Sequence, residues 1–80
     1  LLGKPACVQC KATERKLDAE ELNYNKEDIY EESNLATVQE LGYMAAPVVL
    51  IRNEAGELVD HWAGFNPTKI SGLASELKAA

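Results

Sequence analysis

Hydrophobic residues recur at helical spacing in three segments of this 80-residue chain and run together in one short stretch. The first helical segment covers residues 7–20, which are mostly good helix formers. Cys10, Thr13 and Leu17 fall on one stripe of that helix. Pro5 precedes it, and proline is tolerated at a helix entry but not in a helix interior. The pattern therefore predicts a first helix with one inward face.

Two further helices are predicted downstream. Ser33 or Asn34 can cap the second helix and Gly42 ends it, because short polar side chains favour a helix start and glycine a helix end. Asn66 and Pro67 are suited to be the cap and the first residue of the last helix. The inward positions are Leu35, Val38 and Leu41 in the second helix and Ile70, Leu73, Ala74 and Leu77 in the last.

Strand patterns fill the segments between these helices. Residues 1–4 are interpreted as the trimmed end of a first strand, and residues 22–29 alternate weakly, which predicts a second. Residues 48–51 form a continuous apolar run, which is typical of a strand covered on both faces. Turn-forming residues follow at 53–56, and residues 57–62 return as a further strand, so we expect a hairpin.

Cys7 and Cys10 are the only cysteines and form a Cys-x-x-Cys motif at the start of the first predicted helix. Two thiols at this spacing can close a disulfide in the first helical turn, where free N–H groups and the helix dipole favour a thiolate. A nucleophilic thiolate beside a second thiol is the minimal apparatus for disulfide exchange. Because no export signal is seen, we expect a cytoplasmic protein whose cysteines are catalytic or metal-binding.

The order of the elements is strand, helix, strand, helix, strand, strand, helix. A parallel βαβ unit joined to an antiparallel hairpin and a covering helix makes a four-stranded mixed sheet flanked by three helices, with helices on both faces. This α/β order is that of the thioredoxin/glutaredoxin fold, in which a Cys-x-x-Cys motif near a βαβ unit is the expected redox motif. A chain of 80 residues suffices for a single domain of this kind.

Net charge narrows the choice of partners. The value of −5 argues against nucleic acid, and no apolar run approaches the roughly 20 residues that cross a bilayer. We therefore expect no nucleic-acid or membrane partner, and a monomer. The charged residues between positions 18 and 40 are acidic apart from Lys26, whereas basic residues surround the cysteines and favour a lowered cysteine pKa. These basic residues are Lys4, Lys11, Arg15 and Lys16, opposed by Glu14 alone.

Three segments resemble the NrdH-type redoxins, which are glutaredoxin-like in sequence and thioredoxin-like in activity. They are residues 4–10 (Lys-Pro-Ala-Cys-Val-Gln-Cys), 46–49 (Ala-Pro-Val-Val) and 61–67 (His-Trp-Ala-Gly-Phe-Asn-Pro). The resemblance implies that Cys7 is an exposed nucleophile and Cys10 a partly buried resolving thiol. It also implies a protein-disulfide reductase without a bound cofactor. Such a protein takes electrons from NADPH through thioredoxin reductase and passes them to class Ib ribonucleotide reductase or another disulfide protein.

The same resemblance assigns further residues to substrate or partner binding. Pro47 corresponds to a proline that is cis in this fold and faces the cysteines, which leaves the Ala46 backbone free to pair with an extended substrate segment. For Trp62 we favour the edge of the active-site surface, and for Phe65 we favour packing in the core. The binding candidates are Pro5, Val8, Gln9, Lys11, Ala46, Pro47, Trp62, Gly64 and Phe65.

The third segment departs from the family pattern. Ala63, Asn66 and Thr68 stand where the family commonly has serine, arginine or glutamine, and an acidic residue. These changes remove a hydroxyl and a charge pair, so we expect a different hydrogen-bond network in this loop. The redox role of the cysteines does not depend on it.

Two alternatives stay open. A glutathione-dependent glutaredoxin usually has a Gly-Gly pair, a polar residue and an aspartate at the start of the last helix. This chain has one glycine there, Gly64, between the bulky rings of Trp62 and Phe65, and no aspartate. Lys4 would still suit a carboxylate of glutathione. A metal-binding module without enzymatic activity would use the cysteines as half of a zinc site, or bridge an iron–sulfur cluster between two copies. The only histidine is His61, to which we assign no role.

Overall fold

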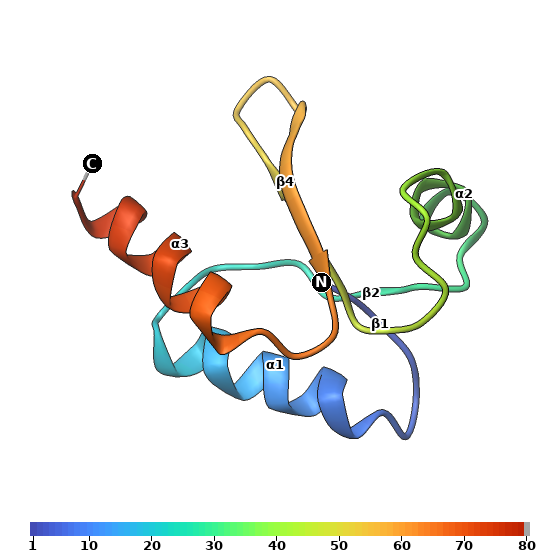
Figure 1. Cartoon of the computed structure of the whole chain (residues 1–80), viewed down its shortest axis with the longest axis horizontal. Helices are drawn as coiled ribbons and strands as arrows, with labels where there is room; N and C mark the ends of the chain where they lie inside the picture. Colours follow the sequence, from blue (N-terminus) through green and yellow to red (C-terminus); the bar gives the residue numbers. More distant parts are fainter. Residues whose placement is uncertain (80) are drawn as a thin grey trace.

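The computed structural model describes residues 1–79, and its elements follow the predicted order (Figure 1). They are β1 (Leu2–Gly3), α1 (Val8–Ala19), β2 (Glu27–Asp28), α2 (Glu32–Glu40), β3 (Val48–Arg52), β4 (Leu58–Ala63) and α3 (Pro67–Ala79). None of the helices in this described part of the chain has the length and apolar character needed to cross a bilayer.

The strands form one four-stranded mixed sheet in the order β2-β1-β3-β4. β1 is parallel to β2 and antiparallel to β3. β3 and β4 form an antiparallel hairpin, in whose turn Asn53 Oδ1 accepts hydrogen bonds from the N–H groups of Ala55 and Glu57. Gly56 in this turn has a φ of +83°, a left-handed conformation that glycine adopts without steric cost. The predicted βαβ unit and hairpin are both confirmed.

Helices cover both faces of the sheet (Figure 1). Two core clusters result, because successive side chains of a strand point to opposite faces. The cluster under α1 and α3 consists of Leu1, Leu17, Val49, Trp62 and Ile70. The cluster under α2 consists of Leu2, Ile29, Val38 and Val48. This arrangement confirms the predicted α/β thioredoxin-like fold and a central strand that is covered on both sides.

The start of α2 differs from the prediction. Glu31 is the N-cap, and Ser33 and Asn34 lie in the first helical turn. Both side chains donate hydrogen bonds to the Glu31 carboxylate, at 2.7 and 3.2 Å. Asn34 also donates to the Asp28 carbonyl at 3.0 Å, so it fastens α2 to β2 instead of capping the helix. Gly42 follows the end of the helix with a φ of +84°, as expected.

The strand predicted over residues 22–29 is reduced to the two residues of β2. The N–H groups of Glu27 and Ile29 donate to the carbonyls of Leu1 and Gly3, both at 2.9 Å. The partner strand β1 is equally short, so the parallel pairing cannot extend further. The residues that caused the alternation pack against the core without joining the sheet; they are Leu22 and Tyr24.

The last helix confirms its predicted start but only part of its inward face. Asn66 Oδ1 accepts the N–H of Lys69 at 3.1 Å, so Asn66 caps α3. Ile70 is fully buried and Ala74 is 2% exposed. Leu77 is 59% exposed, so its assignment to the core was wrong. The physical reason is that α3 runs past the edge of the sheet before it reaches this turn (Figure 1).

Replacing Ile70 with alanine should lower the free energy of unfolding by about 2–5 kcal/mol, because it empties a fully buried site. Leu77→Ala on the same helix is the control and should change it by no more than about 0.5 kcal/mol. Urea unfolding followed by circular dichroism measures both. Equal losses at the two positions would contradict the packing of α3 described above.

Candidate active site

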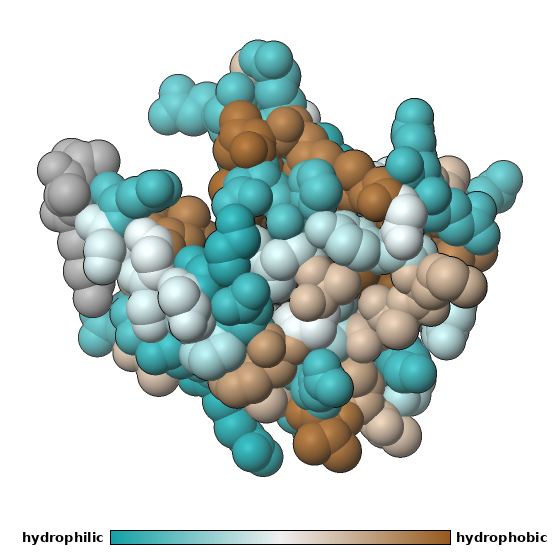
Figure 2. Space-filling view, viewed as in Figure 1, coloured by the Kyte–Doolittle hydropathy of each residue, from teal (hydrophilic) through white to brown (hydrophobic). Residues whose placement is uncertain are grey.

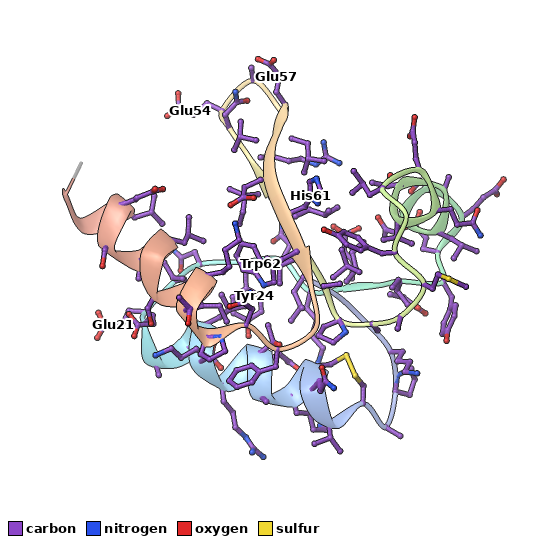
Figure 3. All side chains as sticks on the ribbon, viewed as in Figure 1. Glu21, Tyr24, Glu54, Glu57, His61 and Trp62 are labelled. Atoms are coloured by element: carbon purple, nitrogen blue, oxygen red, sulfur yellow. A yellow bond between two sulfur atoms is a disulfide. The ribbon has the colours of Figure 1, made fainter. Side chains whose placement is uncertain are left out.

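Cys7 and Cys10 form a disulfide at the N-terminus of α1, with their Cα atoms 5.2 Å apart; Figure 3 draws it as a yellow bond. Cys7 is the N-cap of the helix, and its Sγ accepts a hydrogen bond from the N–H of Cys10 at 3.1 Å. A sulfur in this position serves one of the N–H groups that lack a partner within the helix. The same position favours negative charge on that sulfur when the disulfide is reduced.

The segment before α1 turns the chain so that the disulfide lies against the sheet. Ala6 has a φ of +54°, in the left-handed region that residues with a Cβ rarely adopt. Cys7 is extended, with a φ of −107° and a ψ of 109°. A Cβ added at Gly3 would lie 3.5 Å from Cys10 Sγ, so β1 is in direct contact with the disulfide. The sequence analysis missed Gly3, for which the available signal was a glycine inside a predicted strand.

Both cysteines are buried in the disulfide form, with exposed fractions of 7% for Cys7 and 4% for Cys10. The expected exposure of Cys7 is therefore wrong for this form, because the disulfide and the Cys10 N–H hold its sulfur inward. Val8 follows at once and is 84% exposed. Figure 2 shows apolar surface over the start of α1, next to hydrophilic residues.

The peptide bond between Ala46 and Pro47 is cis, as the resemblance implied. Pro47 is less than 2% exposed, and its carbonyl accepts the N–H of Gly64 at 2.8 Å. Within residues 1–79, Ala46 takes part in none of the backbone hydrogen bonds that connect turns and loops. Pairing of the Ala46 backbone with a substrate segment stays a prediction.

Gln9 connects the Cys-x-x-Cys motif to the turn before α3. Its Oε1 accepts a hydrogen bond from the N–H of Phe65 at 3.2 Å, across 56 positions of sequence. Gly64 has a φ of +78°, and a Cβ there would lie 3.3 Å from the same oxygen. The structure thus brings together three residues that were predicted separately as binding candidates. The hydrogen bond itself was not foreseen, because a glutamine carries no sequence signal for so distant a partner.

Trp62 was expected at the surface and Phe65 in the core, and the structure shows the reverse. Trp62 is 5% exposed and belongs to the core cluster under α3, so its assignment to the active-site edge was wrong (Figure 3). It pairs with Val49 across the hairpin, and paired residues point to the same face of a sheet. Phe65 is 42% exposed, so packing in the core was also the wrong expectation. Phe65 lies beyond the end of β4, where the strand alternation no longer directs it inward.

Lys69 covers the Trp62 ring and fixes the start of α3. Its Nζ lies 5.6 Å from the ring centroid and 2.9 Å from Asp60 Oδ2. The hydrogen bond from Lys69 lowers the pKa of Asp60, and the N–H of His61 adds to the effect. Because the pKa is lowered in the folded chain, this pair favours folding above the ordinary pKa of Asp60 and loses its contribution as the pH falls through the lowered value. The pair is exposed to solvent, so its effect is small.

The predicted basic surroundings of the cysteines are only partly present. Lys4 and Lys11 line a cavity of about 380 Å³ beside the disulfide, together with Pro5. Lys16 does not reach this cavity and forms an ion pair with Glu20 at 3.1 Å instead. Three acidic side chains also line the cavity: Glu14, Glu27 and Asp28. Lys26, at the wall of the cavity, forms an ion pair with Glu14. The electrostatic environment beside the disulfide is therefore mixed and not uniformly basic.

His61 packs against Tyr43. Its Nδ1 lies 2.6 Å from the hydroxyl oxygen of Tyr43, and the two rings meet edge to face with centroids 5.5 Å apart. In the described residues 1–79, no group of three or more histidine, cysteine, aspartate or glutamate side chains is placed to hold a metal ion.

Comparison with known proteins agrees with the fold and the disulfide. No protein-family model matches the chain. The chain is similar to the SPbeta prophage-derived thioredoxin-like protein YosR of Bacillus subtilis (strain 168), with 29% identity over 77 residues that cover 96% of this chain and 94% of the relative. Together with the Cys7–Cys10 disulfide, this likeness fits a redoxin of the thioredoxin superfamily. In chemical terms it supports a thiol–disulfide oxidoreductase.

In the reduced protein, replacing Lys11 with glutamate should raise the pKa of the Cys7 thiol. Lys11 lines the cavity beside the cysteines, and exchanging a cation for an anion there disfavours the thiolate. The rate of iodoacetamide alkylation against pH measures this pKa. Arg52→Glu, which makes the same change of charge at the far end of β3, is the control. An unchanged pKa in Lys11→Glu would mean that the helix N-terminus, and not the lysine, activates Cys7.

Proposed function

We propose that this chain is a dithiol electron donor that reduces disulfides in other proteins. Its electrons come from NADPH through thioredoxin reductase, and its acceptor is class Ib ribonucleotide reductase. The observation that carries the proposal is the Cys7–Cys10 disulfide at the cap of α1, within a thioredoxin-like fold. The resemblance of three segments to NrdH-type redoxins supports the choice of reductase and acceptor. We further propose that the protein acts as a cytoplasmic monomer without a bound cofactor.

The reaction follows from the position of the two sulfurs. In the reduced protein the Cys7 thiolate attacks one sulfur of the partner disulfide, so that an intermolecular S–S bond forms and the partner's S–S bond breaks. The departing partner sulfur takes up a proton. The Cys10 thiol then loses its proton, and its sulfur attacks Cys7 Sγ, which closes the internal disulfide and releases the second partner thiol. Two electrons pass to the partner in each cycle.

The hydrogen bond from the Cys10 N–H to Cys7 Sγ affects the first step of substrate reduction and the recharging of the protein. It stabilises negative charge on Cys7 Sγ, which makes Cys7 the better thiolate before the first step. It also makes Cys7 the better leaving group at the end of recharging, when the second thiol of the reductase displaces Cys7 from the mixed disulfide formed at Cys7, since a sulfur of low pKa leaves faster. Cys10 contacts Gly3 of β1 and is 4% exposed, against 7% for Cys7 at the helix cap. These features support Cys7 as nucleophile and Cys10 as resolving thiol.

A glutathione-dependent glutaredoxin is the second candidate. Lys4 and Lys11 line the cavity beside the disulfide and would suit the carboxylates of glutathione. Trp62 is buried and would not obstruct glutathione, so Phe65 is the bulky ring exposed on the loop before α3. The NrdH-type reading is still preferred, since that loop offers one glycine and no acidic residue.

A coupled assay that follows NADPH oxidation on a protein disulfide distinguishes the two candidates. We expect turnover with thioredoxin reductase and only background with glutathione plus glutathione reductase. Cys7→Ser should abolish turnover, because the nucleophile is lost. Cys10→Ser should accumulate a mixed disulfide with the partner, which non-reducing electrophoresis detects.

The opposite preference for electron source would identify a glutaredoxin. Absence of turnover with either source would refute both candidates. If turnover occurs with thioredoxin reductase, class Ib ribonucleotide reductase is the acceptor to test next.

A further inference from the structure

Two hydrogen bonds join three chain segments in series: the Cys-x-x-Cys motif, the turn of residues 64–66 and Pro47. The first runs from the Phe65 N–H to Gln9 Oε1 at 3.2 Å. The second runs from the Gly64 N–H to the Pro47 carbonyl at 2.8 Å. Gln9 lies inside the Cys-x-x-Cys motif, so its side chain is the link between the redox helix and the other two segments.

The contact between Gln9 and the turn is closely fitted. A Cβ at Gly64 would lie 3.3 Å from Gln9 Oε1, a distance at which the glutamine would have to give way. Gly64 also has a φ of +78°, which residues with a Cβ adopt only at a cost. The turn therefore presents two backbone features to Gln9: a bare Cα and an N–H donor.

The hydrogen bond between Gln9 and the Phe65 N–H fixes the backbone of a residue whose side chain lies at the surface. Phe65 follows the buried β4 residue Trp62, yet its own side chain is 42% exposed. Val8 in the motif is 84% exposed. An exposed aromatic side chain on a turn that is hydrogen-bonded to the motif offers an apolar contact to a partner, provided that the turn is ordered before the partner arrives.

We infer that Gln9 is a positioning residue that fastens the turn of residues 64–66 to the redox helix and so holds Phe65 ready for an apolar side chain beside the partner's disulfide. Gln9 touches neither sulfur in this role. Because the hydrogen bond to the Gln9 carboxamide already orders the turn, docking of a partner loses less conformational entropy. The partner side of this inference rests on the proposed function, whereas the hydrogen bond does not.

The test compares Gln9→Met with the parent in the reduction of insulin by dithiothreitol. Methionine has a similar length but cannot serve as a strong acceptor, so the bond to the Phe65 N–H is lost. We expect the KM for insulin to rise about three- to tenfold, the effect of one hydrogen bond, with little change in kcat. Gln9→Glu keeps an acceptor oxygen and should restore most of the affinity. Gln39→Met, an exposed glutamine on α2, is the matched control and should behave as the parent.

A double-mutant cycle with Phe65→Ala tests whether Gln9 acts through Phe65. If it does, Gln9→Met should raise the KM much less in the Phe65→Ala background than in the parent. Fully additive effects would show that Gln9 contacts the partner itself, which overturns the inference. A fall in kcat with unchanged KM would overturn it as well, because it would place Gln9 in the chemical step.

Amide hydrogen exchange of Phe65 separates this inference from the proposed function. In the parent the Phe65 amide should be protected, and in Gln9→Met its exchange should become about three- to tenfold faster. Unchanged exchange would refute the hydrogen bond even if insulin is reduced normally. If the parent does not reduce insulin, the proposed function and the docking role of Phe65 both fail, and the exchange rates alone decide whether Gln9 holds the turn.

Discussion

The hydrogen bond from the Cys10 N–H to Cys7 Sγ joins the start of α1 to the redox centre. The sulfur that caps the helix is also one of the two sulfurs of the disulfide, so whatever orients α1 orients the site. Thr13 and Leu17 bury the inner face of this helix, and its first turn contacts β1 at Gly3. The packing of the helix against the sheet therefore also maintains the geometry of the cysteines. A small domain can in this way hold its site with the same contacts that stabilise its core.

β1 holds both cores and the site together although it is very short. It has two residues, yet it lies between β2 and β3 in the sheet. Leu1 and Leu2 at this strand belong to different core clusters, one on each face. Gly3 follows with its Cα against Cys10 Sγ. Three consecutive residues thus contribute to both cores and to the site, because successive side chains of an extended chain alternate between faces.

Periodicity predicted the features that depend on local chemistry. The stripe of α1, the cap of α3, the hairpin turn and the cysteine pair were all found where residue type and spacing placed them. The errors arise where a neighbour in space decides the outcome. Leu77 continues a helical pattern but lies beyond the sheet, and Asn34 meets β2 before it can act as a cap. Trp62 lies on the same face of β4 as the exposed Asp60, so alternation along the strand did not indicate its burial, which comes from its cross-strand partner Val49 and the cluster under α3.

The four residues of the Cys-x-x-Cys motif, at the cap and first turn of α1, have different surroundings. Successive side chains of a helix point about 100° apart, whereas side chains three positions apart are neighbours, so the two cysteines meet while the two residues between them point elsewhere. In this chain Cys7 caps the helix, Val8 faces solvent, Gln9 reaches the turn of residues 64–66, and Cys10 faces β1. A motif with this spacing therefore separates the redox pair from the two residues between them. Those intervening positions can set the shape of the partner surface, while the sulfurs keep the geometry that disulfide exchange requires.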